Sequence, residues 1–253
     1  MTQVKKYDAI IFDLFSTVAI WQADRLPLFQ WRGKTSHSTM GILQHSVETL
    51  VAEASFETFV DALDSANKKL SARRATEMKE IPSVERFALA LTIAGYPASQ
   101  QTNDLAQILS LKHMELLASA VEIPQAHVDF LSKIHTRYPL ALLSNFDHGP
   151  TARAILKRDG AANFFDPIVI SDEHGWRKPH ANIFADTLET LHVEAKNALY
   201  VGDSVEDDIV GAKGAGLDIA WVNARGADLP EQSLKPDYVI SAIPDLSVIL
   251  LNG

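Results

Sequence analysis

The segment AIIFDLFST, residues 9–17, places a run of four apolar residues directly before an aspartate. A short, uninterrupted apolar run is typical of a strand that is buried on both faces, as in a parallel sheet. Asp13 stands where this strand is expected to end, and Phe15 and Thr17 follow in a loop. Because ligands of open parallel sheets bind beyond the carboxyl ends of the strands, Asp13 is the first candidate for a functional residue.

Similar runs recur later in the chain and indicate the fold class. The runs lie at residues 140–143, 167–170, 198–201, 219–222 and 238–240. From residue 126 onward they alternate with helical patterns at residues 126–137, 150–158, 181–191, 206–215 and 245–251. Such alternation predicts βαβ units and therefore an α/β fold with a Rossmann-like parallel sheet.

The stretch between about residues 20 and 124 has a different pattern. It contains no convincing strand, but apolar residues recur at helical spacing over residues 39–54, 56–74, 83–94 and 103–120. We therefore predict an inserted helical domain of roughly 100 residues. The expected boundaries are 1–18 and 125–253 for the catalytic core and 19–124 for the insertion.

Composition excludes several classes of function. The 23 basic and 32 acidic residues give a net charge of −9, which argues against a nucleic-acid partner. The chain has no cysteine, so disulfides, thiolate nucleophiles and iron–sulfur clusters are excluded. No apolar run approaches the roughly 20 residues of a membrane span, and no targeting segment is visible. We expect a soluble cytoplasmic protein, a monomer or homodimer, with no membrane partner.

The ends of the predicted strands bring several polar groups to one edge of the sheet. Asp13 follows the first run, Ser144 and Asn145 follow the second, and Asp203 follows the run at 198–201. Lys178 stands in a loop before the helix at 181–191. Two facing carboxylates repel each other unless a cation lies between them, and an all-oxygen ligand set favours Mg²⁺. The acidic residues Glu206 and Asp207 are interpreted as favouring the start of a helix.

Four segments taken together resemble a known family. IIFDLFST, LLSN, GWRKPHANIF and YVGDSVEDDIVGAKGAG resemble, in order, the four motifs of the haloacid dehalogenase superfamily of hydrolases. The resemblance covers about residues 7–18 and 126–225, and the helical insertion matches the cap domain of the family in position and class. The series of four is specific, whereas each motif alone is weak.

The resemblance implies a mechanism and a metal site. Asp13 would be the carboxylate nucleophile, which forms a covalent aspartyl intermediate that water then hydrolyses. Mg²⁺ would be held by Asp13, by the backbone carbonyl of Phe15 and by Asp203, while Asp208 would hold the metal shell or Lys178 in place.

The resemblance also implies how the transferring group is bound. Ser144, the Asn145 amide and Lys178 would bind it and neutralise the developing charge. Thr17 would orient the nucleophile loop. In the insertion, Arg32 stands among aromatic residues; we weigh simple core packing there against a guanidinium that binds a substrate carboxylate or phosphate.

One position departs from the phosphatases of the family. They carry a second acid two residues after the nucleophile, which protonates the leaving oxygen, and here that position is Phe15. The residues Asp147, His148 or Glu173 are candidates to replace it. Asp8 is not, because it lies at the other end of the strand, about 16 Å away.

The aromatic residue keeps other reactions open. The true dehalogenases carry a Tyr at this position and need no acid, but they lack the metal-binding aspartate that Asp203 matches, and they carry a Tyr where Phe184 stands. Ser16 also replaces the usual Gly of the loop. A phosphonatase-like reaction would need a Schiff-base lysine in the cap, for which Lys34, Lys68 and Lys69 are candidates.

A hydrolase that has lost its activity and only binds a phosphorylated ligand is the non-enzymatic alternative. We expect a Mg²⁺-dependent hydrolase of a small anionic metabolite, with a phosphate ester as the expected substrate.

Overall fold

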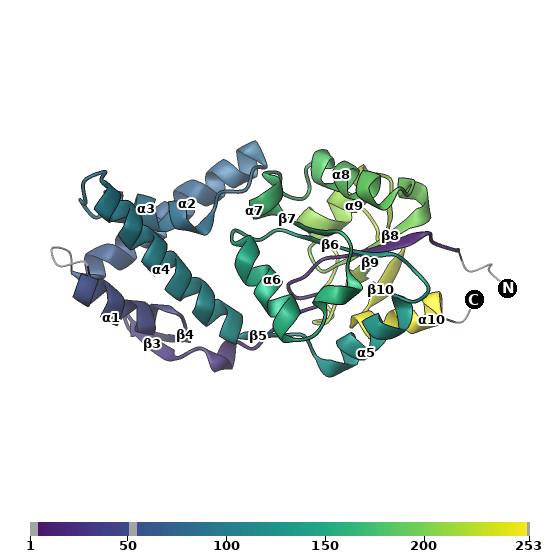
Figure 1. Cartoon of the computed structure of the whole chain (residues 1–253), viewed down its shortest axis with the longest axis horizontal. Coiled ribbons are helices and arrows are strands. Elements are labelled where there is room, and N and C mark those ends of the chain that lie inside the picture. Colours follow the sequence, from purple (N-terminus) through teal and green to yellow (C-terminus); the bar gives the residue numbers. More distant parts are fainter. Residues whose placement is uncertain (1–4, 51–54, 252–253) are drawn as a thin grey trace. The chain divides into compact units, whose positions relative to one another are not determined.

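The computed structural model describes residues 5–50 and 55–251 (Figure 1). The chain divides into two compact units. Met1–Trp21 and Glu122–Gly253 form the first, which we call the core unit, and Gln22–Val121 form the second, the inserted unit. Residues 51–54 of the helix predicted at 39–54, like residues 1–4 of the predicted core, lie outside the described residues.

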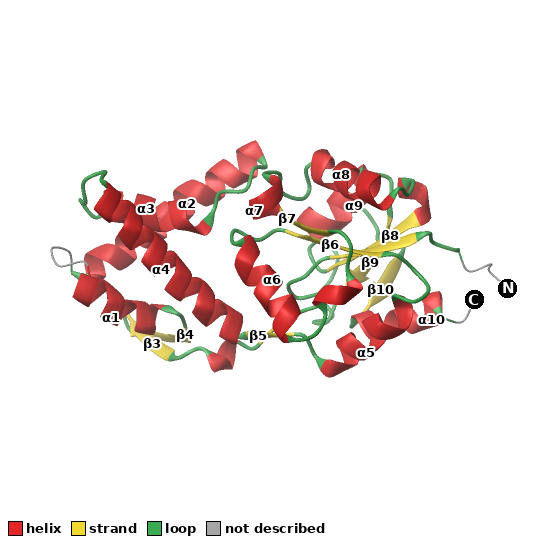
Figure 2. Cartoon of the chain, viewed as in Figure 1, coloured by secondary structure: helices red, strands yellow, loops and turns green. Residues whose placement is uncertain are grey.

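The core unit is built on a six-stranded sheet with the order β10-β9-β8-β1-β6-β7 (Figure 2). All of its strand pairs are parallel, which confirms the predicted α/β class. Each predicted apolar run corresponds to one strand, although Pro167 lies just before the strand that its run predicts. The strands are β1 (Ala9–Phe12), β6 (Leu140–Ser144), β7 (Ile168–Ile170), β8 (Ala198–Gly202), β9 (Asp218–Val222) and β10 (Tyr238–Ile240).

Burial explains why the central strands have no polar face. Every residue of β1, β6 and β8 is buried. On one face, Ile11, Tyr200 and Ile219 pack with Ile183 and Phe184. Side chains alternate along a strand, so neighbouring residues such as Ile10 and Phe12 point to the opposite face, and they are also fully buried. Helices must therefore cover both faces, as in a doubly wound sheet.

The helices of the core unit are α5 (Gln125–Ile134), α6 (Gly149–Arg158), α7 (Ser171–His174), α8 (Ala181–Leu191), α9 (Val210–Gly214) and α10 (Ser247–Leu250). The helices predicted at 126–137, 150–158 and 181–191 correspond to α5, α6 and α8, whereas α7 is not predicted and the other two predictions differ from the structure. The single helix predicted at 206–215 is instead a π-helical turn, Val205–Ile209, that continues as α9. The helix predicted at 245–251 begins as a 3₁₀ turn, Ile243–Leu246.

The inserted unit is mainly helical. Its helices are α1 (Met40–Leu50), α2 (Phe56–Glu77), α3 (Ser83–Ile93) and α4 (Gln100–Ser119). They enclose their own apolar core, in which Phe59, Phe87 and Leu109 are buried. The last helix begins three residues before the predicted position because the Ser99 side chain accepts a hydrogen bond from the backbone of Thr102.

The prediction of no strand in this stretch is wrong. Residues Leu28–Trp31 (β3) and Lys34–His37 (β4) form an antiparallel hairpin in which Trp31 pairs with Lys34. The two turn residues, Arg32 and Gly33, have φ values of 47° and 76°, as the tight turns of hairpins require. The strand β4 is exposed throughout, so it lacks the apolar alternation by which a strand is recognised in a sequence. The two-residue strands β2 (Ile20–Trp21) and β5 (Val121–Glu122) were also not predicted.

Within the described residues, none of the helices combines the length and the apolar character that a membrane span requires.

A close contact between two helices of the core unit generates a stability prediction. A Cβ atom on Gly211 of α9 would lie 2.5 Å from Cζ of Phe184, which is fully buried and has no room to move. We expect Gly211→Ala to lower the free energy of unfolding by about 1–3 kcal/mol. Thermal denaturation followed by circular dichroism measures this as a fall of roughly 2–4 °C per kcal/mol.

Gly214 of the same helix is the matched control. A Cβ atom there would have no heavy atom within 4 Å, so Gly214→Ala is expected to leave the melting temperature unchanged or slightly raised. Equal melting temperatures for the two variants would contradict the packing argument.

Candidate active site

The loop after β1 holds Asp13 at the carboxyl edge of the sheet. Its backbone amide donates a hydrogen bond to the carbonyl of Val201 at 2.8 Å, which continues the strand pairing by one residue. The loop then closes on itself, since Ser16 N donates to Ala19 O and Ala19 N donates to Leu14 O, both at 2.7 Å. Ser16 has a φ of 61°, the left-handed conformation that a glycine would adopt without strain. The tight loop fixes the Asp13 carboxylate in a buried position.

Lys178 is the centre of the site. The residue is 3% exposed, and its ammonium donates hydrogen bonds to Asp13 Oδ1 at 2.7 Å, to Asp208 Oδ1 at 2.7 Å and to the Tyr200 hydroxyl at 2.8 Å. Three acceptors match the three N–H donors of an ammonium group, so this buried charge is fully hydrogen-bonded. Because burial alone disfavours the charged form, the two carboxylates are what hold the pKa of Lys178 above its ordinary value.

Asn145 positions that lysine. Its side-chain carbonyl accepts a hydrogen bond from the Lys178 backbone amide at 2.8 Å, and its side-chain nitrogen donates to the Lys178 carbonyl at 2.9 Å. The amide that the sequence suggested for substrate binding therefore holds the backbone of Lys178 from both sides.

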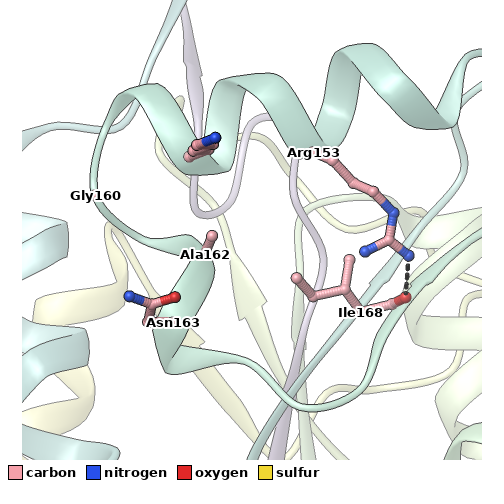
Figure 3. A pocket seen from close by; sticks show the side chains of 6 residues that line it. Arg153, Gly160, Ala162, Asn163 and Ile168 are labelled. Carbon is pink, nitrogen blue, oxygen red and sulfur yellow. Dashed lines mark hydrogen bonds between the residues drawn. The ribbon is translucent and has the colours of Figure 1, made fainter.

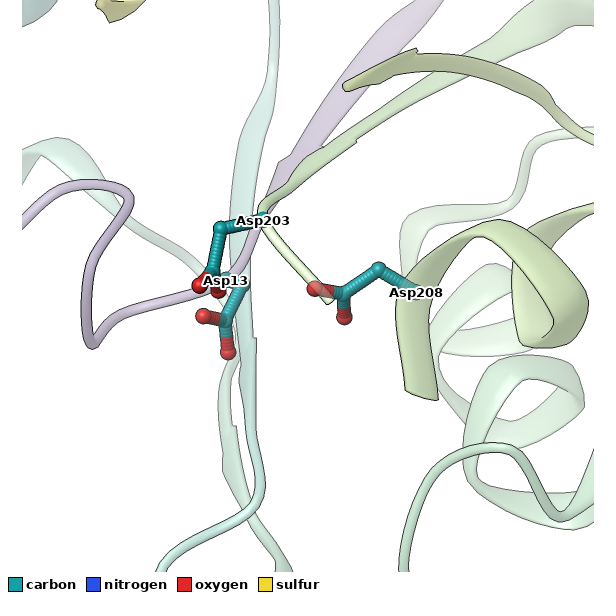
Figure 4. Close-up of side chains that lie close together, drawn as sticks. All are labelled: Asp13, Asp203 and Asp208. Carbon is teal, nitrogen blue, oxygen red and sulfur yellow. The ribbon is translucent and has the colours of Figure 1, made fainter. Parts of the chain in front are cut away.

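Asp203 and Asp208 come from the segment after β8. Carboxylate oxygens of Asp13, Asp203 and Asp208 all lie within 4.8 Å of one another (Figure 4). Asp208 is engaged at both oxygens, because Oδ1 accepts from Lys178 and Oδ2 accepts from the backbone amide of Ser204 at 2.9 Å. The π-helical turn brings this carboxylate against Gly202, where a Cβ atom would collide with it.

The charges around the lysine do not balance. Burial raises the pKa of Asp13 to about 7; Lys178 opposes that rise and Asp208 adds to it. Burial, with a further contribution from Asp208, also raises the pKa of Asp203 to about 6. One ammonium thus faces three carboxylates, and burial, together with repulsion from Asp208, raises the pKa values of Asp13 and Asp203.

The donor set fits Mg²⁺. It consists only of oxygen atoms, which a hard divalent cation prefers. Asp13 and Asp203 have raised pKa values, although Lys178 contacts Asp13, because burial and the neighbouring Asp208 disfavour their charged forms; a divalent cation would favour those forms. Asp208 is committed to Lys178 and Ser204 and so serves to position the lysine.

Two predicted hydroxyl groups are buried in the same unit. Ser144, the last residue of β6, and Thr17, in the nucleophile loop, are completely buried. Within the part of the chain that the structure describes, neither side-chain oxygen has a hydrogen-bond partner. A buried hydroxyl without a partner costs free energy unless a ligand satisfies it, so both are candidates to bind one.

The acidic cluster opens into a cavity of about 220 Å³. Phe15, Lys178 and Asp207 line it together with the cluster. Two residues of the site cannot be recognised from the sequence. Asp207 is interpreted there as favouring the start of a helix, and Tyr200 is a tyrosine within an apolar strand, which is indistinguishable from core packing.

Other residues considered from the sequence have partners of their own. Arg32 lies in the inserted unit, where its guanidinium is 2.8 Å from Asp61 Oδ2. Of the residues proposed to replace the missing acid, Glu173 forms an ion pair with Arg153 at 2.6 Å and His148 is hydrogen-bonded to Thr151 at 2.8 Å.

A second cavity, of about 370 Å³, lies beside α6 (Figure 3). Among the described residues, no carboxylate lines it, and its Arg153 donates to the carbonyl of Ile168 at 3.1 Å. It offers no acid for metal binding or nucleophilic attack, so we place the chemistry in the cavity at Asp13.

Comparison with known proteins places this geometry in a family. A family model described as haloacid dehalogenase-like hydrolase matches residues 48–222. A pyrimidine 5′-nucleotidase of Escherichia coli is 32% identical over 124 residues, 49% of this chain and 54% of that protein. A glyceraldehyde 3-phosphate phosphatase of Pyrococcus furiosus is 38% identical over 90 residues, 35% of this chain and 38% of that protein. The chain thus spans about half or less of the length of these curated relatives.

Solved structures agree on the fold. The 2-haloacid dehalogenase from Pseudomonas syringae superposes with a TM-score of 0.71 at 23% identity, over 97% of this chain and 98% of that one. The putative hydrolase YfnB from Bacillus subtilis superposes with a TM-score of 0.62 at 22% identity, over 97% of this chain and 99% of that one.

The raised pKa values of the two acids predict how stability depends on pH. A carboxyl group whose pKa is higher in the folded than in the unfolded chain binds more protons when folded, so the free energy of unfolding falls as pH rises through about 4 to 7. With the pKa of Asp13 near 7 and that of Asp203 near 6, we expect the metal-free protein to lose more stability between pH 5.5 and pH 8 than its Asp13→Asn variant does. The buried His113, whose pKa burial lowers to about 3, acts in the opposite direction in both proteins. A loss of at least about 1 kcal/mol corresponds to roughly 2–4 °C by scanning calorimetry.

Magnesium and two variants control this measurement. Mg²⁺ is expected to raise the melting temperature more at pH 8, where the carboxylates are ionised, than at pH 5.5. Asp13→Asn should remove the part of the pH dependence that comes from Asp13, whereas Asp129→Asn, on an exposed residue of α5, should preserve it. Identical changes in melting temperature from pH 5.5 to pH 8 in the wild type and in Asp13→Asn would show that the pKa of Asp13 is not raised.

Proposed function

The chain belongs to the haloacid dehalogenase-like hydrolases, and from this membership we propose that it is a Mg²⁺-dependent phosphatase that acts on a small phosphorylated metabolite. The observation that carries the proposal is the buried ammonium of Lys178, 2.7 Å from the Asp13 carboxylate, within a cluster of acids. A carboxylate nucleophile that attacks an anion needs its charge masked, and this arrangement masks it.

The metal would be held by Asp13, Asp203 and the backbone carbonyl of Phe15, while Asp208 holds Lys178. When bound, Mg²⁺ supplies charge neutralisation for the carboxylate nucleophile and for the phosphoryl oxygens. The structure of the Bacillus subtilis relative is described as bound to magnesium, which supports the same metal here.

The residues of the chain then have defined roles. A carboxylate oxygen of Asp13 attacks phosphorus, forming an aspartyl phosphate while the bond to the leaving oxygen breaks. The Lys178 ammonium and the hydroxyl groups of Ser144 and Thr17 donate hydrogen bonds to the phosphoryl oxygens as negative charge develops. Water then attacks the phosphorus of the aspartyl phosphate, which releases phosphate and restores the Asp13 carboxylate.

The relatives support a phosphate ester as substrate. Besides the nucleotidase and the glyceraldehyde 3-phosphate phosphatase, an N-acylneuraminate-9-phosphatase of mouse is 32% identical over 141 residues, 54% of that protein. These proteins act on phosphate monoesters of small metabolites by their names, so we propose the same class for this chain. Arg32 of the inserted unit, whose guanidinium is 2.8 Å from Asp61, stays a sequence-based candidate for a substrate contact.

Dehalogenation is the second candidate, favoured by one observation. Phe15 supplies no proton at the position two residues after the nucleophile, and a halide leaves without one. The two reactions separate under chelation: halide release from a 2-haloacid that persists in EDTA would favour the dehalogenase, whereas loss of phosphate release in EDTA would favour the phosphatase.

The first functional prediction concerns the nucleophile. Asp13→Asn replaces the carboxylate by an amide of similar size, so no aspartyl intermediate forms. We expect turnover of p-nitrophenyl phosphate in the presence of Mg²⁺ to fall by at least about 10³-fold. Asp129→Asn is the matched control and should keep full activity. Phosphate release by Asp13→Asn at the wild-type rate would exclude Asp13 as the nucleophile.

The second functional prediction concerns the missing acid. Phe15→Asp places a carboxyl group among apolar rings, where desolvation raises its pKa and keeps a proton available. We expect turnover of alkyl phosphates, whose leaving groups need protonation, to rise by about 10²-fold, while p-nitrophenyl phosphate changes little. Phe15→Leu, measured in parallel, should show no such gain. An unchanged rate on alkyl phosphates in Phe15→Asp would mean that another residue already serves as acid.

A further inference from the structure

Three aromatic side chains from separate segments meet beside the nucleophile. The ring of Phe15 lies with its centroid 4.5 Å from that of Phe146 and 5.5 Å from that of Trp21, to which it is nearly parallel. Phe15 belongs to the loop after β1, Trp21 ends β2, and Phe146 lies between β6 and α6. All three belong to the core unit, and we call them the aromatic platform.

The platform begins at the wall of the catalytic cavity. Phe15 lines the same cavity as Asp13 and Lys178, and Asn145, the neighbour of Phe146 in sequence, lines it too. The apolar surface is therefore continuous with the site at which the phosphoryl group would bind.

The rings are not buried as core residues are. Trp21 is 38% exposed, and Phe15 and Phe146 are half-buried, whereas Phe12, one residue before Asp13, is fully buried. Grouped aromatic rings that keep contact with solvent are typical of surfaces that bind a partner or a ligand.

The loop does not need these rings for its shape. Its backbone is already closed by the hydrogen bonds between Ser16 and Ala19 and between Ala19 and Leu14. The carbonyl of Val18 is also hydrogen-bonded to the buried ring of His127 at 2.9 Å. A purely structural role therefore leaves the exposure of the three rings unexplained.

Chemistry at the same position limits the leaving group. Phe15 has no proton to give, so the oxygen that departs from phosphorus must be stable as an anion. An oxygen attached to an unsaturated ring meets this condition because the ring delocalises its charge, and a planar ring also stacks on aromatic side chains. Both requirements point to the same class of substrate.

We infer that the aromatic platform binds the leaving group, and that the natural substrate is a phosphate ester of a planar, unsaturated ring. The inference rests on the proposed phosphatase function and adds to it the class of the leaving group. Trp21 and Phe146 are thereby specificity-determining residues, which contact the part of the substrate that departs.

Two phosphonates that cannot be hydrolysed test the platform by itself. Benzylphosphonate and ethylphosphonate both carry a CH₂ group on phosphorus, but only the first carries a ring. Titration calorimetry of the full chain with Mg²⁺ should show benzylphosphonate bound about tenfold more tightly, the scale of an aromatic contact together with its buried area. In Trp21→Leu the ratio of the two dissociation constants should fall to about two or less. Phe164→Leu, which alters a half-buried ring that packs on His135 elsewhere in the core unit, should keep the tenfold ratio.

Each outcome separates the inference from the proposed function. Hydrolysis of phosphate esters together with equal affinities for the two phosphonates would overturn the inference and leave the phosphatase function standing. A preference for benzylphosphonate that Trp21→Leu does not reduce would also overturn it, since the ring would then bind elsewhere. Absence of both phosphonate binding and phosphate release would overturn the proposed function and the inference with it.

Discussion

The buried ammonium of Lys178 is the interaction on which the site depends. Removing an ammonium group from water costs several kcal/mol, and only well-placed acceptors offset that cost. Here Asp13, Asp208 and Tyr200 accept its three hydrogen bonds, and Asn145 holds its backbone. These partners come from four separate segments, so the lysine joins the ends of three strands into one constellation. Loss of the ammonium would leave two acids buried side by side without a counter-charge.

The order of the strands makes this convergence possible. β1 lies between β6 and β8, and both pairs run parallel, so the carboxyl ends of the three strands meet at one edge. That much follows from the sequence, because continuous apolar runs ending at Asp13, Ser144 and Asp203 predict buried parallel strands and a shared edge. The oxygen ligands and the ammonium at that edge could likewise be predicted from residue types and their order alone.

The remaining features depend on contacts that a sequence does not display. Tyr200 is hidden inside an apolar strand, and its hydroxyl has a role only because Lys178 reaches it from another loop. Asn145 is a plausible substrate ligand by its position, yet both ends of its amide hold the Lys178 backbone. The hairpin of the inserted unit is exposed on its second strand, so no apolar periodicity distinguishes it from a loop. Local propensity and pattern indicate elements, whereas side-chain partners arise from tertiary packing.

A site with more buried carboxylates than positive charges lowers the stability of the fold. The proposed reaction nevertheless requires these carboxylates. Three carboxylates around one ammonium repel one another, and the raised pKa values of Asp13 and Asp203 express that repulsion together with their burial. A balanced cluster would be more stable but would have no use for a divalent cation. The position two residues after Asp13 carries no charge. Phe15 places an apolar ring beside the acids, where phosphatases of the family carry a second acid. Charge is thus concentrated where the phosphoryl group would bind and removed where the leaving group would depart, and under the proposed function this division of the cavity would favour substrates whose leaving group needs no proton.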